Sequence, residues 1–233
     1  MEQRPTHLKL RDVPTLILHV GPDETAYHVH QDLLFSASKV FKAAFSGKFR
    51  ESSDRSMSLP DDDVEAFESM TRWLYTQKLE LSDPITAETS SECYWQLAKL
   101  NTLADKYDIT TLKNLIIDKL FELSVPPKYV KPPQMDVITY VYQNTTEKSS
   151  FRKLIVAWYT WNIDFKWYTD DITRDVILKL PEFTADLAIS LALRTGYHAI
   201  NPLRGRSSNY HEKPAEEVVK KNVGGVLNST CTA

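Results

Sequence analysis

The chain has 233 residues, of which 42% are hydrophobic and 25% charged, and its net charge at pH 7 is −3. These values are typical of a globular protein and argue against the strongly basic surface that nucleic-acid binders usually carry. Two cysteines are too few for a disulfide framework or a cysteine-ligated zinc site.

Three short strands are predicted in the first 60 residues, after a leader over residues 1–13. The run TLILHVG is rich in β-branched and aliphatic residues and ends at Gly21-Pro22, which marks a turn. The segment AYHVH returns as the hairpin partner of this strand. The segment RSMSLP alternates in polarity at Met57 and Leu59, which predicts a third strand over residues 55–60.

The pattern changes from strand to helix at His30. In HQDLLFSASKVFKAAF the apolar residues recur at helical spacing in two short runs, with Ser38 between them. A histidine at this junction indicates either a metal site or a structural motif. His28 and His30 share a strand face, but no Asp, Glu or Cys is placed to complete a tetrahedral site with His19. We therefore predict no metal here.

Three longer helices are predicted next. The acidic start DDD, at residues 61–63, suits a helix N-terminus through capping and the helix dipole better than it suits a cation site. Apolar residues at helical spacing then mark helices over 64–75, 94–107 and 110–123. Thr110 is expected to cap the last of these helices.

A stiff connector is predicted over residues 125–136, because two double prolines within it fix the backbone and lack amide donors. Residues 137–201 form a predicted helical region, in which Pro181 divides two late helical pieces. An amphipathic helix is marked there by Phe151, Leu154, Ile155 and Trp158. From residue 202 to 233 the periodicity is lost and polar residues gather, which predicts a disordered tail.

Four motifs, in one of which LPDDD leads into AFESMTRWLYT, resemble those of the BTB/POZ domain. GKFRES and LPDDD, at residues 47–52 and 59–63, are two family-like segments, and LADKYDITTLKNLIIDKL resembles the family's later helix pair. AFESMTRWLYT carries the family's Trp73, Leu74 and Tyr75. The leading signature, H-x-x-L-L-x-x-S-x-x-F-x-x-x-F, is present at His30, Leu33, Leu34, Ser38, Phe41 and Phe45.

The resemblance implies a BTB/POZ fold over residues 14–124. This is an α+β architecture, a small sheet flanked by helices, followed here by an all-α C-terminal region. In the family the histidine ends the second strand and opens the first short helix, so the role of His30 is architectural, and Phe41 and Phe45 would pack under the sheet. Residues 138–159 are similar to the region after the domain in many fungal members.

The resemblance also implies a non-enzymatic protein–protein interaction adaptor. Substrate receptors of cullin-type ubiquitin ligases carry a hydrophobic–x–Glu motif after the helix that contains the residues matched here by Phe41 and Phe45. Phe49-Arg50-Glu51 matches this motif. We assign Phe41, Phe49 and Glu51 to a contact with a cullin scaffold. Phe49 could equally serve to cover its own loop.

The alternative is a self-associating scaffold or transcriptional cofactor without a ligase role. Family members that form homodimers often use a charged pair, and its two places hold Thr15 and Gln31 in this chain. That difference argues against the charged pocket but leaves an apolar homodimer interface open. The leader segment THLKLRD could supply a swapped strand.

Catalytic and ligand-binding motifs are not found in the sequence. A P-loop, a G-x-G arrangement and a G-x-S-x-G elbow are all missing, so we predict no enzyme and no cofactor. The aromatic stretch AWYTWNIDFKWYTDD could stack on bases, but its aspartates would repel a nucleic-acid backbone.

The expected compartment follows from two further patterns. The N-terminal segment lacks the apolar core of a signal peptide, and no window approaches the ~20 apolar residues that a membrane span needs. We therefore expect an intracellular protein of the cytoplasm or nucleus, neither secreted nor in a membrane.

Overall fold

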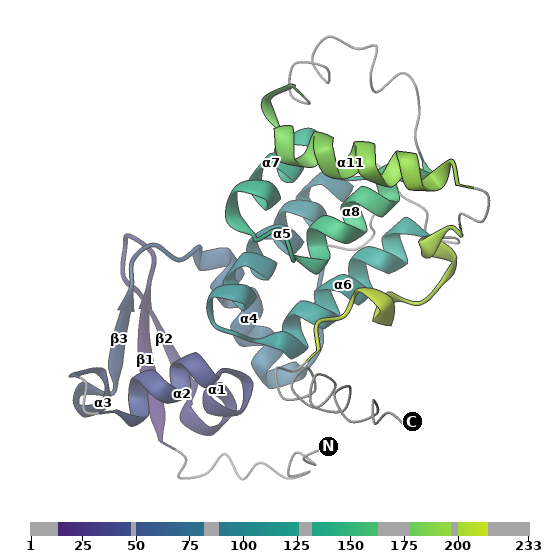
Figure 1. Cartoon of the computed structure of the whole chain (residues 1–233). Coiled ribbons are helices and arrows are strands. Elements are labelled where there is room, and N and C mark those ends of the chain that lie inside the picture. Colours follow the sequence, from purple (N-terminus) through teal and green to yellow (C-terminus); the bar gives the residue numbers. More distant parts are fainter. Residues whose placement is uncertain are drawn as a thin grey trace, which may run out of the picture.

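The computed structural model describes residues 14–47, 50–81, 89–125, 132–162, 178–196 and 200–213, without the side chains of Arg50 and Ser52. Within these residues a three-stranded sheet with short helices is followed by a larger group of helices (Figure 1). The α+β class predicted from the sequence is confirmed. None of the described helices is both long and apolar enough to cross a bilayer.

The sheet has the order β2-β1-β3. Its central strand β1 (Thr15–Val20) pairs antiparallel with β2 (Thr25–His30) and parallel with β3 (Ser56–Leu59). In this register Leu16 lies opposite Val29. The predicted hairpin and third strand are therefore confirmed.

Side chains alternate between the two faces of a strand, and in β1 every second side chain is buried, so one face of the strand lies against the core. The buried residues of β1 are Leu16, Leu18 and Val20. The turn after the strand requires a glycine at position 21, where φ is 75° and an added Cβ would lie 2.6 Å from Cγ2 of Val64. This close approach brings the start of a later helix against the hairpin.

Ser38 divides the helical stretch after β2 into two helices. Its hydroxyl accepts a hydrogen bond from the backbone N–H of Phe41 at 3.1 Å, which caps the second helix, and donates to the carbonyl of Tyr107 at 2.6 Å. The same serine thus ends one helix, starts the next and connects both to the turn at Tyr107. The short helices here are α1 (Gln31–Ala37), α2 (Lys39–Ser46) and α3 (Arg50–Asp54).

The junction between the next helices differs from the prediction. After α5 the chain reverses through Asp108, whose φ is 51°, with bonds from Asp108 N–H to Asp105 O (3.1 Å) and from Ile109 N–H to Ala104 O (2.8 Å). This turn places buried Ile109 at the N-cap, so the predicted Thr110 cap is wrong and Thr110 is the first helical residue. The helices are α4 (Val64–Thr76), α5 (Ser90–Lys106) and α6 (Thr110–Ser124).

The later helices pack directly on the earlier ones. α7 (Met135–Asn144) lies against α5, and α8 (Ser150–Trp161) lies against α6 and α11 (Pro181–Arg194). Trp158 of α8 is fully buried and meets Tyr94 of α5 edge to face at 5.8 Å. Buried residues from the sheet to α11 form one continuous cluster. The predicted apolar face of α8 is confirmed by the burial of Phe151, Leu154, Ile155 and Trp158.

The predicted disorder from residue 202 onward is wrong for residues 202–213. These residues contain two 3-10 helices, η1 (Pro202–Arg204) and η2 (Ser207–Tyr210), which pack on α8 and, for η2, also on α6. The physical reason is that Leu203 is buried and the polar residues after η2 find partners on α6. The rest of the predicted tail, and most of the predicted helical piece before Pro181, lie outside the described residues.

Candidate protein-interaction surface

His30 joins the end of β2 to α4. It stands at the N-cap of α1, and its backbone N–H donates to the hydroxyl oxygen of Tyr75 at 3.2 Å. Its Nδ1 lies 2.7 Å from the same hydroxyl, and the two rings meet edge to face. The histidine and tyrosine motifs singled out in the sequence thus meet in space. Tyr75 remains 41% exposed, so this junction reaches the surface.

Phe41 does not lie on the partner surface that the sequence suggested. Its ring is fully buried and stacks on Tyr107 at 4.2 Å, because the inner face of α2 is covered by the turn after α5. We therefore withdraw Phe41 from the partner-binding residues. The other signature residues of the interior are likewise buried: Leu33, Leu34, Ser38, Phe45, Trp73 and Leu74.

The corner between α2 and α3 carries the remaining predicted contact residues. Phe49 lies outside the described residues, whereas Glu51 is in the first turn of α3 and half-buried. On α2, Val40 is 42% exposed although it is apolar. Immediately after α3, the guanidinium of Arg55 donates to Oε1 of Gln31 at 3.0 Å. Gln31, which occupies one of the two positions of the family's charged pair, is therefore hydrogen-bonded to a residue of the same chain.

The three consecutive aspartates before α4 have three different environments. Asp61 is exposed, and Asp63 caps α4 by accepting from the N–H of Ala66 at 2.9 Å, as predicted. Asp62 is buried, where Nζ of Lys106 donates to it at 2.7 Å and the Tyr107 hydroxyl donates to its other oxygen. Burial, together with this hydrogen bond, raises the pKa of Tyr107.

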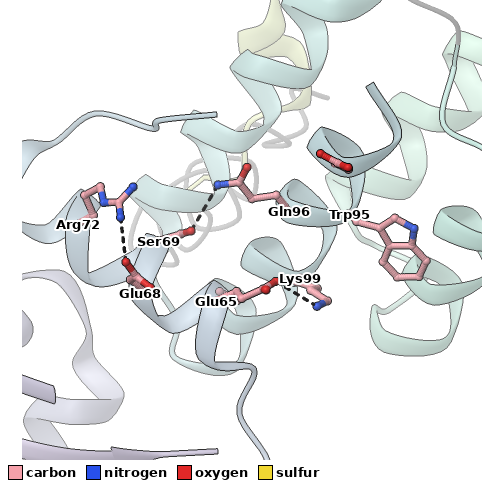
Figure 2. Close-up of a pocket in the computed structure, with 9 residues that line it drawn as sticks. Glu65, Glu68, Ser69, Arg72, Trp95, Gln96 and Lys99 are labelled. Atoms are coloured by element: carbon pink, nitrogen blue, oxygen red, sulfur yellow. Dashed lines mark hydrogen bonds and ion pairs between the residues drawn. The ribbon is translucent and has the colours of Figure 1, made fainter. Parts of the chain in front are cut away.

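A cleft of about 500 Å³ is lined by residues of α4 and α5, which pack against each other (Figure 2). Four of its charged residues form ion pairs: Arg72 with Glu68 at 2.9 Å, and Lys99 with Glu65 at 3.7 Å, although Lys99 lies closer to Asp63, at 2.8 Å. Trp95 lies at one side of the cleft, as Figure 2 shows. This cleft is not predictable from the sequence, because its walls come from two separate helices; the local signal among the described residues is a half-exposed tryptophan on α5.

The cleft offers polar groups that already bind one another. Such walls suit contact with another protein surface, because polar partners at a rim can exchange hydrogen bonds at little cost. Among the described residues, no three His, Cys, Asp or Glu side chains gather in a way that could hold a metal ion.

Comparison with known proteins adds two findings. The family model for the BTB/POZ domain matches residues 7–123, half of the chain. A protein of Arabidopsis thaliana named ARM repeat protein interacting with ABF2 is 28% identical over 114 residues. That similarity covers 49% of this chain but only 14% of the plant protein, so the chain spans a small part of that relative.

Proposed function

This chain belongs to the BTB/POZ family, whose members are protein–protein interaction adaptors, and on that premise we propose that it is a substrate receptor for a cullin-type ubiquitin ligase. In this role the BTB/POZ domain binds the cullin scaffold, and the helices after it present a substrate. The name of the plant relative describes a protein that interacts with another protein, which is in keeping with an adaptor.

The corner between α2 and α3 carries the proposal. The hydrophobic–x–Glu motif of the sequence ends there with Glu51, which is half-buried in the first turn of α3. An aromatic residue two positions before an acid supplies, in sequence, the apolar anchor and the carboxylate that the proposed contact needs. On α2, the apolar side chain of Val40 is exposed and is a further candidate contact.

The helical region supplies a candidate substrate face. Ile189 and Leu193 lie one turn apart on α11 and are 62% and 72% exposed. Apolar side chains at i and i+4 project from the same helix face. Exposed apolar patches on a protein surface often mark interaction sites. This face is separate in sequence from the cullin-binding corner.

Calorimetric titration of the full chain against the N-terminal domain of a cullin from the same organism tests the proposal. We expect micromolar or tighter binding, weakened at least about tenfold in a Phe49→Ala/Glu51→Ala variant because it loses both the anchor and the carboxylate. Glu147→Ala, an exposed carboxylate after α7, is the matched control and should bind like the wild type. Absence of binding by the folded wild type would refute the receptor role.

Self-association is the second candidate, favoured by the sheet itself. Within the described residues β2 and β3 are both edge strands, each paired on one side only. Edge strands present unpaired backbone groups that can pair with a second chain. Under this alternative, sedimentation velocity gives a dimer mass for both the wild type and the Phe49→Ala/Glu51→Ala variant. A concentration-independent monomer would exclude it.

A further inference from the structure

Residues 200–213, here called the strap, run back along the helical region and end beside α6 (Figure 1). Its contacts with α6 join positions as much as 98 residues apart in sequence. The strap is an irregular segment held on a helix surface, which is also how many short linear peptides bind to folded domains.

Asn114 of α6 binds the backbone of the strap. Its Nδ2 donates to the carbonyl of Glu212 at 3.1 Å, and its Oδ1 accepts from the N–H of the same residue at 2.8 Å. A side-chain amide has one acceptor and two donors, so it can satisfy both backbone groups of one residue at once. This pair of bonds recognises an extended backbone whatever side chain it carries.

Consecutive strap side chains each meet a different partner on α6. Nε2 of His211 lies 2.7 Å from Oδ1 of Asp118, and a carboxylate oxygen of Glu212 lies 2.5 Å from Nζ of Lys113. Just before them, the ring of Tyr210 packs at 6.2 Å from that of Phe121. In chain order, the contacts are made by an aromatic residue, a histidine and an acid.

The α6 residues concerned form one surface. Asn114, Asp118 and Phe121 are spaced i, i+4 and i+7, which places them on one side of the helix. Lys113 beside them is 9% exposed and is also bound by Asp105 at 2.8 Å. Although burial alone would lower the pKa of Lys113, hydrogen bonds to Asp105 and Glu212 raise it, so its ammonium group stays charged. We call Lys113, Asn114, Asp118 and Phe121 the α6 surface.

The strap fills this surface imperfectly. The hydroxyl of Tyr210 is buried and has no hydrogen-bond partner among the described residues, and a buried hydroxyl without a partner costs free energy. Its burial raises the pKa of Tyr210 to about 12. None of the residues in η2 is buried as a whole. A competitor can therefore improve on the resident segment.

Room for a longer ligand lies beside the strap. A cavity of about 490 Å³ borders residues His211 to Lys213 and is walled on its other side by Asp105, Ser149 and Lys153. A peptide that follows the path of the strap can continue into this space.

We propose that the α6 surface is a binding site for linear peptides in which an aromatic residue is followed by histidine and an acidic residue. In this chain the strap is its resident occupant, and a partner segment of the same chemistry competes with it. The site is independent of the cullin contact, since Phe49 and Glu51 lie on a different segment.

The test uses the full chain and a fluorescently labelled peptide of residues 205–213, GRSSNYHEK. A chain with His211→Ala and Glu212→Ala keeps the α6 surface but has a loosened strap. We expect this loosened chain to bind the peptide at least about tenfold more tightly than the wild type, measured by fluorescence anisotropy. The reason is that a tethered segment competes at an effective concentration on the order of millimolar.

Two controls separate recognition from general stickiness. The peptide with the same two alanine substitutions should bind neither chain. Adding Asn114→Ala to the loosened chain should weaken binding at least about fivefold, because the backbone bonds are lost. Adding Glu122→Ala, an exposed position on α6, should leave binding unchanged. Circular dichroism establishes folding, and Glu212→Ala alone replaces the double variant if that variant does not fold.

A peptide carrying Tyr210→Phe gives a sharper readout. It should bind the loosened chain several-fold more tightly than the natural peptide, because it buries no unpaired hydroxyl. Equal affinity of the wild-type and loosened chains for the natural peptide, or no binding to a folded loosened chain, would overturn the proposal.

Discussion

Asp61, Asp62 and Asp63 are the same residue type, and each of them has a different energetic role. Asp62 is the buried one, holding Lys106 and the hydroxyl of Tyr107. Replacing it with alanine leaves that hydroxyl unpaired in the interior. We expect Asp62→Ala to lower the free energy of unfolding by about 2 kcal/mol. Asp61→Ala, at an exposed position, should change it by less than about 0.5 kcal/mol.

Urea denaturation followed by circular dichroism measures both variants under the same conditions. Equal destabilisation by the two alanines would show that the buried network does not stabilise the fold.

Asp63 gives a pH-dependent contribution. Partial burial by itself would raise its pKa, but hydrogen bonds from Lys99 and Ala66 and the charge of Lys99 lower it below its ordinary value of 3.8. A carboxylate with a lowered pKa stabilises the fold above its unfolded pKa, and this stabilisation is lost as the pH falls through the folded value. Asp63→Ala should therefore cost about 1 kcal/mol at pH 7.

The difference between wild type and Asp63→Ala should shrink as the pH is lowered past 3.8. Thermal unfolding at a series of pH values between 3 and 7 follows it. A gap of constant size down to the lowest pH would mean that the charge of Asp63 is not involved.

At the scale of elements, Arg152 fastens α8 to its neighbours. The side chain is 5% exposed and donates to the carbonyls of Tyr142 and Thr145 at the end of α7 and to Glu182 of α11. Arg152→Ala leaves the carbonyls of Tyr142 and Thr145 without this charged donor, so we expect a loss of about 2–3 kcal/mol. Arg152→Lys should recover little, because one ammonium group cannot reproduce the planar fork.

Lys153→Ala is the matched control, since the next residue of α8 is exposed. Chemical denaturation compares the three variants. If Arg152→Ala and Lys153→Ala were equally stable, the joint between α7, α8 and α11 would have to depend on apolar packing alone.

At the scale of the molecule, the BTB/POZ region and the helices after it share one buried cluster. Tyr94 precedes the proline-rich connector in the sequence and Trp158 follows it, yet their rings are in contact. We therefore expect one cooperative unfolding transition. Trp158→Ala should lower the free energy of unfolding of the whole cooperative unit by about 3–5 kcal/mol.

Hydrogen exchange with mass spectrometry tests this at both ends of the cluster. Protection of β1 and of α8 should fall together in Trp158→Ala. Loss of protection in α8 alone would indicate two independently stable parts.

Local features were predictable from the sequence and distant contacts were not. The Asp63 cap and the buried stripe of α8 depend on residues within two turns of each other, so their patterns are visible in the chain. Phe41 is apolar on any account, but its burial depends on Tyr107, and the sequence does not show that the two rings meet. The N-cap of α6 likewise moved to Ile109 because of a turn that local propensity does not encode.

The strap was missed for the same reason. Its composition is that of a disordered segment, and its order comes from Asn114 and neighbouring residues far earlier in the chain. Part of the candidate cullin contact, Phe49, stays a sequence prediction because it lies outside the described residues.

The separation of 98 residues between Asn114 and Glu212 also has a consequence in time. A ribosome adds roughly 5–20 residues per second, so α6 is made on the order of 5 to 20 seconds before the segment that covers it. During that interval the helix can fold against its earlier neighbours while its outer side is still bare. In every newly made molecule the α6 surface is therefore exposed for a time, and a peptide that binds it during that time does not compete with the strap.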